Sequence, residues 1–338
     1  MGALLQVGGL TVALPTRSGY HKAVDDLSFA VDAGEVMGIA GESGSGKTMT
    51  ALSLFGLLPH GARVTGSIRL DGTELLGLTS KQLRAIRGRQ IAMVSQDPST
   101  ALHPILPIGT QLTEHMRYHL GVTKTEAMTR AAELLRTVRI PDPEQALRSY
   151  AGQFSGGMRQ RIAIAVALAA EPRLLVADEP TTALDVTVQA GILRLLDRLC
   201  RERGMAVIVI THDLGVMSAT ARRLYVMYAG RLAEAGPTSE LLARPRHPYT
   251  RGLLDALPHP EGGGGAPLVP IGGSPPTLGR VPVGCPFHPR CRYAEPSCAT
   301  DRPEPRLIAD THLLACPPDP LRTAVPAAEG GPDGSDPP

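Results

Sequence analysis

The sequence of 338 residues contains no long apolar run. Its longest, IAIAVALAA at residues 162–170, is far shorter than the roughly 20 residues that span a bilayer as a helix. The opening segment MGALLQVGGL has neither the basic lead-in nor the cleavage site of a secretory signal. Gln6 also stands where a myristoylation signal requires Ser or Thr. We therefore expect a cytoplasmic chain that reaches a membrane only through a partner.

The sequence also lacks a large excess of positive or of negative charge. The chain has 34 Lys and Arg residues against 32 Asp and Glu residues, a formal net charge of +2. A nucleic-acid-binding protein needs a basic surface, and a small group such as Arg84, Arg87 and Arg89 is better explained as a solvated helix face. The composition thus predicts no nucleic-acid partner, while a hydrophobic content of 43% permits a sizeable core.

Cysteine is scarce until the C-terminal region, which holds four of the five. A cytosolic location disfavours disulfides, so Cys285, Cys291, Cys298 and Cys316 hold a metal, a cluster or nothing. Their spacing lacks the C-x₂-C pairs of most structural zinc sites. Four thiolates on an irregular segment can ligate a [4Fe–4S] cluster, which we favour over Zn²⁺. Such a centre can hold a proline-rich segment folded.

Composition divides the chain into zones. Residues 1–97 and 155–240 alternate short apolar strands with helices and predict one α/β nucleotide-binding core. Residues 98–154 predict a helical subdomain, in which Met128, Ala131, Leu135 and Val138 share one face of a helix. Residues 241–320 predict an irregular lobe rich in Cys and Pro, and residues 321–338 a disordered tail.

The strongest motif is GESGSGKT, which follows the predicted strand 33–41 and precedes a helix. Glycines let the main chain wrap around a triphosphate, and the helix N-terminus offers further N–H groups to it. We expect Lys47 to reach the β- and γ-phosphates and Thr48 to ligate Mg²⁺. The predicted ATP-binding residues are Gly41, Glu42, Ser43, Gly44, Ser45, Gly46, Lys47 and Thr48.

Two further motifs complete the predicted site. RLLVADEP at residues 173–180 is a buried strand that ends in two carboxylates, so Asp178 is expected near Mg²⁺ and Glu179 as the general base. FSGGMRQR at residues 154–161 predicts a second anion-binding helix N-terminus, with Ser155 as its N-cap and Gly156 and Gly157 allowing close approach. One nucleotide needs only one such helix N-terminus for its phosphates. We therefore expect the second to complete the nucleotide site of another subunit.

Together these motifs resemble the ATP-binding subunit of an ABC transporter, over residues 34–240. The resemblance implies a RecA-like P-loop NTPase fold with a helical subdomain. It also implies that Gln96 in MVSQDP touches the Mg²⁺ site, that Asp185 in TTALD lies at the dimer seam, and that His212 in VITHD contacts the γ-phosphate. The family's adenine-stacking aromatic residue falls near Leu14 here, and Tyr20 is the nearest aromatic.

The segments DPSTALHP, DVTVQAGIL and 234–258, together with the cysteine pattern, resemble the oligopeptide/dipeptide importer subfamily, which includes nickel importers. That resemblance implies an ATPase that energises uptake, with a second ATPase subunit, two permeases and an external solute-binding protein as partners. The alternatives are a nickel or other small-solute importer, a non-transport ABC ATPase acting on DNA or ribosomes, and a plain kinase. A kinase would leave the Ser155 segment and His212 unexplained.

Overall fold

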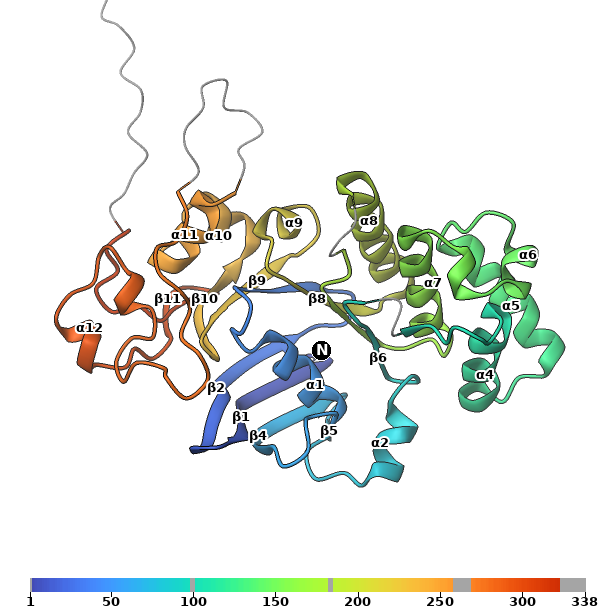
Figure 1. Cartoon of the computed structure of the whole chain (residues 1–338), viewed down its shortest axis with the longest axis horizontal. Helices are drawn as coiled ribbons and strands as arrows, with labels where there is room; N and C mark the ends of the chain where they lie inside the picture. Colours follow the sequence, from blue (N-terminus) through green and yellow to red (C-terminus); the bar gives the residue numbers. More distant parts are fainter. Residues whose placement is uncertain (1, 98–100, 182–184, 258–268, 323–338) are drawn as a thin grey trace, which may run out of the picture.

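The computed structural model describes residues 2–97, 101–181, 185–257 and 269–322. The strands form two sheets (Figure 1). One is antiparallel, in the order β2 (Gly19–Val31), β1 (Leu5–Thr16), β4 (Arg63–Leu70), β5 (Thr73–Glu74). The other has the order β11 (Arg306–Ala309), β12 (His312–Leu314), β10 (Arg231–Pro237), β9 (Arg223–Tyr228), β3 (Val36–Ala40), β8 (Ala206–Thr211), β7 (Leu174–Asp178), β6 (Ile91–Val94).

The middle of the larger sheet is parallel. Strands β9, β3, β8, β7 and β6 run in one direction, and every residue of β3, β7 and β8 is buried. Such fully apolar strands belong between two covered faces of an α/β protein. Because the strands are parallel, their carboxyl ends meet at one edge, where this architecture places ligands.

The helices gather in groups around this sheet. In Figure 1, α4, α5, α6 and α7 lie together at one end of the molecule and α10, α11 and α12 at the other. The described helices are α1 (Lys47–Phe55), α2 (Ser80–Ile86), α4 (Ile108–Leu120), α5 (Lys124–Thr137), α6 (Pro143–Arg148), η1 (Ala151–Gln153), α7 (Gly156–Leu168), α8 (Val186–Arg203), α9 (Leu214–Ser218), α10 (Thr238–Ala243), α11 (Pro248–Asp255), η2 (His288–Arg290) and α12 (Ser297–Thr300). Across the described ranges, no helix combines the length and apolarity needed to cross a membrane.

Helix α5 shows one error in the predicted packing face. Thr123 caps it and accepts from the Glu126 N–H, and Ala131, Leu135 and Val138 are buried as expected. Met128, however, is 36% exposed, while Ala127 is fully buried. The 3.6-residue period places Ala127 within the apolar stripe and Met128 at its edge, where the side chain stays partly exposed.

The C-terminal segment is more than the irregular lobe that its proline content suggests. Its strands β11 and β12 extend the core sheet beside β10. Glu234 of β10, which is fully buried, accepts hydrogen bonds from the backbone N–H groups of Arg246 and His247, and its Oε1 lies 2.8 Å from His312 Nε2. Buried Tyr249 and Phe287 belong to the main hydrophobic core. The segment therefore shares its core with the rest of the protein.

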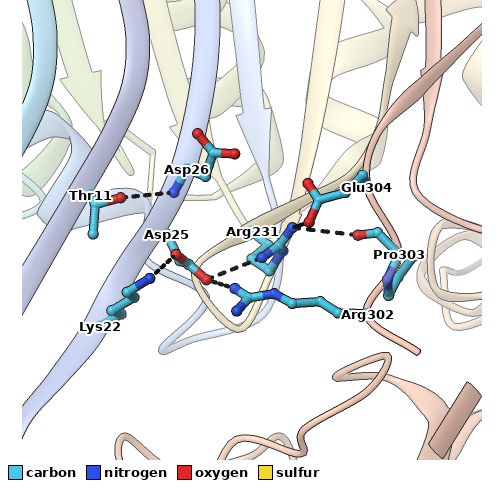
Figure 2. A network of polar contacts seen from close by, with 8 residues as sticks. All are labelled: Thr11, Lys22, Asp25, Asp26, Arg231, Arg302, Pro303 and Glu304. Carbon is cyan, nitrogen blue, oxygen red and sulfur yellow. Dashed lines mark hydrogen bonds and ion pairs between the residues drawn. The ribbon is translucent and has the colours of Figure 1, made fainter. Parts of the chain in front are cut away.

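A second polar network fastens this segment to β2 (Figure 2). The buried carboxylate of Asp25 accepts from Lys22 at 2.8 Å and from Arg231 at 3.1 Å, and it also pairs with Arg302. Arg231 in turn pairs with Glu304 at 2.9 Å. Asp25 thus shares its charge with cations from β2, β10 and the C-terminal segment, which ties the three together.

Through His247, we expect the free energy of unfolding of the protein to depend on pH. Its Nδ1 accepts from the Tyr249 N–H at 3.0 Å, and burial lowers the pKa of His247 to about 4. The unfolded chain binds a proton near pH 6.5 and the folded chain does not, so stability is full above that pH and falls as the pH drops toward 4. We expect this one group to remove about 3 kcal/mol over that window.

The check is urea unfolding at several pH values, with His247→Asn beside the wild type. Asn keeps an N-cap acceptor at the start of α11 but does not titrate, so the variant should lose less stability between pH 6.5 and 4. His60→Asn, at an exposed position, is the matched control. Equal pH dependence in wild type and His247→Asn would contradict the assignment.

Candidate nucleotide site

The segment 41–48 forms a loop between β3 and α1 that only glycine can build at two points. Gly41 has φ 150° and Gly46 has φ 101°. A Cβ on Gly41 would lie 2.2 Å from the Met227 carbonyl oxygen, and one on Gly46 would lie 2.6 Å from the Ala23 carbonyl oxygen. Ser43 and Gly44 are exposed at the tip of the loop, and Ser45 is buried. Gly44 also has a positive φ, of 80°, and successive backbone turns of this kind are typical of loops that bind anions.

Lys47 begins helix α1 and turns back into the loop. Its ammonium donates to the carbonyl oxygens of Gly41 at 2.7 Å and Glu42 at 2.9 Å. Burial lowers the pKa of Lys47, while the carboxylates of Glu179, Asp178 and Glu42 raise it. A buried ammonium surrounded by these oxygens is held beside the loop and is suited to a further anionic ligand.

Asp178 ends strand β7 on the same edge of the sheet. Burial raises the pKa of its carboxyl group, and the Thr48 hydroxyl hydrogen-bonds it and lowers the pKa in turn. Within the described part of the chain, its buried Oδ1 has no hydrogen-bond partner. A buried carboxylate oxygen left unpaired beside a hydroxyl is an oxygen donor set that Mg²⁺ prefers.

Glu179 follows Asp178 with a positive φ of 48°, which turns its side chain away from the strand direction. The Gln96 side-chain amide donates to its Oε2 at 2.9 Å, and His212 Nδ1 lies 3.2 Å from its Oε1. Gln96 follows β6 and His212 follows β8. Three neighbouring parallel strands therefore bring these three residues together, although they are far apart in the sequence.

The Ser155 segment lies elsewhere. Ser155 caps α7 and accepts from the Met158 N–H at 3.3 Å, with Gly156 and Gly157 as the first helical residues. A Cβ on Gly157 would lie 2.8 Å from a methyl group of Val188. In Figure 1, α7 stands among α4, α5 and α6, apart from α1. Asp185 caps α8 through its bond from the Val188 N–H at 2.9 Å and is exposed, while residues 182–184 lie outside the described residues.

Tyr20 lies near the start of β2, where it pairs with Pro15 of β1, and is 43% exposed. The Arg63 guanidinium carbon lies 3.8 Å from the centre of its ring, so a cation from β4 covers one face. Leu14 is partly buried on β1. A base that stacked on this ring would therefore have to use the other face.

The four C-terminal cysteines lie in the same segment but do not form a cage. Cys285 donates its backbone N–H to the Cys298 carbonyl at 2.8 Å. Burial raises the pKa of the Cys316 thiol to about 12, and the other three thiols are near enough to raise it further. Among the described residues, which include all four, no group of three or more His, Cys, Asp or Glu side chains is arranged to hold a metal ion. The expected iron–sulfur or zinc centre is not supported by this geometry.

Two residues at the site were missed by the sequence analysis. The Tyr249 hydroxyl accepts from the Glu42 N–H at 2.7 Å, and Arg290 donates to both oxygens of the Glu42 carboxylate. Arg290 lies inside the cysteine pattern, which drew attention to the thiols alone. Nothing in the local sequence singles out Tyr249, because only the fold brings α11 to the phosphate loop.

Two family models match the chain. The ABC transporter model matches residues 24–182, and the model for the oligopeptide/dipeptide transporter C-terminal region matches residues 233–298. The oligopeptide transport ATP-binding protein OppD of Salmonella typhimurium is 46% identical over 313 residues, 93% of each chain. The dipeptide transport ATP-binding protein DppD of Bacillus subtilis is 46% identical over 318 residues, 94% of this chain and 95% of its own.

Solved structures agree on the fold. A dimeric post-hydrolysis state of the ATP-binding cassette MJ0796, bound to ADP and Pi, is similar with a TM-score of 0.62 and 27% identity, covering 69% of this chain and 98% of that one. The protein cbiO1 of Clostridium perfringens, part of the cbiONQ transporter complex, is similar with a TM-score of 0.61 and 26% identity, covering 72% and 92%. The expected P-loop cassette fold is confirmed.

Proposed function

This chain belongs to the ABC transporter family, and on that premise we propose that it is the ATP-hydrolysing subunit of an importer for dipeptides or oligopeptides. The observation that carries the proposal is the meeting of the phosphate loop, Asp178, Glu179, Gln96 and His212 at one sheet edge. The similarity to OppD and DppD proteins over nearly the whole chain supplies the solute class.

The residues divide the work of hydrolysis. Gly41 to Thr48 form the phosphate-binding loop, in which backbone N–H groups other than those of Glu42 and Ser45 bind the phosphates, and Lys47 neutralises their charge. Thr48, Asp178 and Gln96 would hold Mg²⁺, which would supply further charge neutralisation. Glu179 takes the proton of the attacking water, and Gln96 and His212 hold its carboxylate in orientation while His212 reaches the γ-phosphate.

A second ATPase chain, identical or homologous, would complete the site. The N-terminus of α7 at Ser155, Gly156 and Gly157 lies apart from the phosphate loop of its own chain, so it suits the triphosphate bound to a facing cassette, with Asp185 at the seam. We place the pair on the cytoplasmic face of the plasma membrane, held by two permease subunits and supplied by an external solute-binding protein. Tyr20 is the proposed adenine contact.

The four-cysteine centre remains a hypothesis for this chain. The four thiols lie in one segment, where burial and the charge of neighbouring thiols raise the pKa of Cys285, Cys291 and Cys316. Their protons would have to leave before a [4Fe–4S] cluster or Zn²⁺ could be ligated, and the thiols as placed do not converge. No step of the hydrolysis proposed above passes through them.

The test is purification of the chain from its own cells and reconstitution with the permease subunits that copurify with it. We expect ATP hydrolysis in proteoliposomes to rise several-fold when a binding protein loaded with peptide is added, together with peptide accumulation inside. Stimulation by nickel complexes in place of peptides would favour the metal-importer alternative. Copurification with nucleic acid or ribosomes, and no assembly with permeases, would instead contradict the transport assignment.

A further inference from the structure

Glu42, the second residue of the phosphate loop, is held by two side chains from the C-terminal part of the chain. The Tyr249 hydroxyl accepts a hydrogen bond from the Glu42 N–H at 2.7 Å. The Arg290 guanidinium donates to both carboxylate oxygens of Glu42, at 2.7 and 2.9 Å. These contacts join residues 207 and 248 positions apart in the sequence, so neither is a local feature of the loop.

Both partners are themselves fixed in place. Tyr249 is fully buried, with the rings of Tyr228 and Phe287 packed around it at centroid distances of 4.6 and 5.3 Å. The Arg290 side chain is 5% exposed and donates also to the Tyr228 hydroxyl at 3.1 Å and the Gly272 carbonyl at 2.8 Å. A bidentate arginine with this many partners fixes both the position and the orientation of the carboxylate that it binds.

The remaining polar group of Glu42 serves the loop itself. Its carbonyl oxygen accepts from the Lys47 ammonium at 2.9 Å. We infer that Tyr249 and Arg290 are positioning residues for nucleotide binding: they hold the Glu42 peptide from outside the loop, and this peptide holds Lys47 toward the phosphates. The inference rests on the proposed ATP site and assigns part of its construction to the C-terminal segment.

This role is separate from the docking of that segment. Docking is provided by β12 beside β10 and by the network around Asp25, which includes Arg231 and Arg302 (Figure 2). None of the residues drawn in Figure 2 belongs to the phosphate loop. Removing the contacts to Glu42 should therefore weaken nucleotide binding without releasing the segment.

The experiment uses the full-length chain with Tyr249→Phe and Arg290→Gln. The first deletes one oxygen from a buried ring and keeps the ring's packing. Equilibrium binding of a fluorescent ribose-labelled ATP and steady-state hydrolysis are measured for each. We expect Kd and KM to rise about 3- to 10-fold, as for loss of one buried hydrogen bond or ion pair. The value of kcat should change by less than about twofold, because the lost interaction serves binding.

A double-mutant cycle tests whether the Arg290 effect runs through Glu42. Glu42→Gln alone should weaken binding to a similar degree as Arg290→Gln. The double variant should bind no more than about twofold weaker than either single variant, because both remove the same ion pair. Effects of Glu42→Gln and Arg290→Gln that simply multiply would overturn the inference.

Two matched controls separate positioning from docking. Arg302→Gln removes an arginine that pairs with Asp25 away from the loop. Tyr225→Phe removes the hydroxyl of another buried tyrosine, whose ring packs against Phe29. Both controls should bind ATP as the wild type does.

The outcomes are distinct. Unchanged Kd in both Tyr249→Phe and Arg290→Gln overturns the inference, and so does equal weakening by Arg302→Gln. If Arg290→Gln melts at a lower temperature, Tyr249→Phe decides alone. A wild-type chain that binds no ATP contradicts the proposed function itself, and this is seen before any variant is made.

Discussion

Replacement of Glu179 by Gln is expected to stop ATP turnover while ATP stays bound. The amide keeps the size of the side chain and can still contact Gln96 and His212, but it cannot take a proton from water. Loss of a general base costs about 10²- to 10⁴-fold in rate, so kcat should fall by that amount. Phosphate release measures the turnover, and binding of labelled ATP, measured separately, should match the wild type within a few-fold.

Glu171→Gln is the matched control. Glu171 is another glutamate with a positive φ, here 56°, and it pairs with Arg130 at 3.4 Å on an exposed surface. It should leave both turnover and binding unchanged. A Glu179→Gln chain that hydrolyses ATP at the normal rate would refute the general-base role, and one that fails to bind ATP would point to a structural role instead.

Replacement of Lys47 by Ala is expected to remove ATP binding itself. The ammonium is nearly buried, and its loss leaves the Gly41 and Glu42 carbonyl oxygens without their donor as well as the phosphates without their cation. Charge-assisted hydrogen bonds contribute about 1.5–3 kcal/mol each, so Kd for ATP should rise by about 10²-fold or more. Titration calorimetry with ATP and Mg²⁺ measures the change.

Lys81→Ala provides the comparison, because Lys81 is an exposed lysine on α2. Its affinity for ATP should equal that of the wild type. Tight ATP binding by the Lys47→Ala chain would show that the loop holds phosphate through its backbone alone, and the charge-neutralising role would then be lost.

The meeting of these polar residues at one sheet edge could be anticipated because each part carries its own local signal. An apolar run followed by Gly41 to Thr48, or by Asp178 and Glu179, specifies a buried strand and the polar residues at its end. Parallel pairing then brings those ends together. These residues are recognised by their chemistry and by the apolar run before them, so their place at a strand end can be predicted without knowing the rest of the fold.

The contacts of Tyr249 and Arg290 with Glu42 could not be anticipated in this way. They join positions more than two hundred residues apart, and tyrosine and arginine are common on surfaces as well as in sites. The prediction that Met128 lies on the buried face of α5 was wrong for a related reason. The helical period predicts an apolar stripe, but how far that stripe is buried at its edges depends on the neighbouring helices.

The C-terminal segment was misjudged through composition. Proline-rich stretches predict irregular chain, yet Arg306–Ala309 and His312–Leu314 pair with the edge of the core sheet. The cysteines stand out by spacing alone, and spacing does not determine how side chains converge. No arrangement of side chains among the described residues supports their expected metal centre.

The position of β3 between β8 and β9 has a consequence for synthesis of the chain. The strand that leads into the phosphate loop is made early, but both of its neighbours come from residues 206–228. A ribosome has thus added more than half of the polypeptide before this strand can pair on either side. Such long-range pairing is slow to form. The apolar strand β3 therefore stays unpaired and exposed during much of the synthesis of the chain. Chains truncated before residue 206 should therefore need chaperones to prevent their aggregation, and bound ATP should not replace the chaperones.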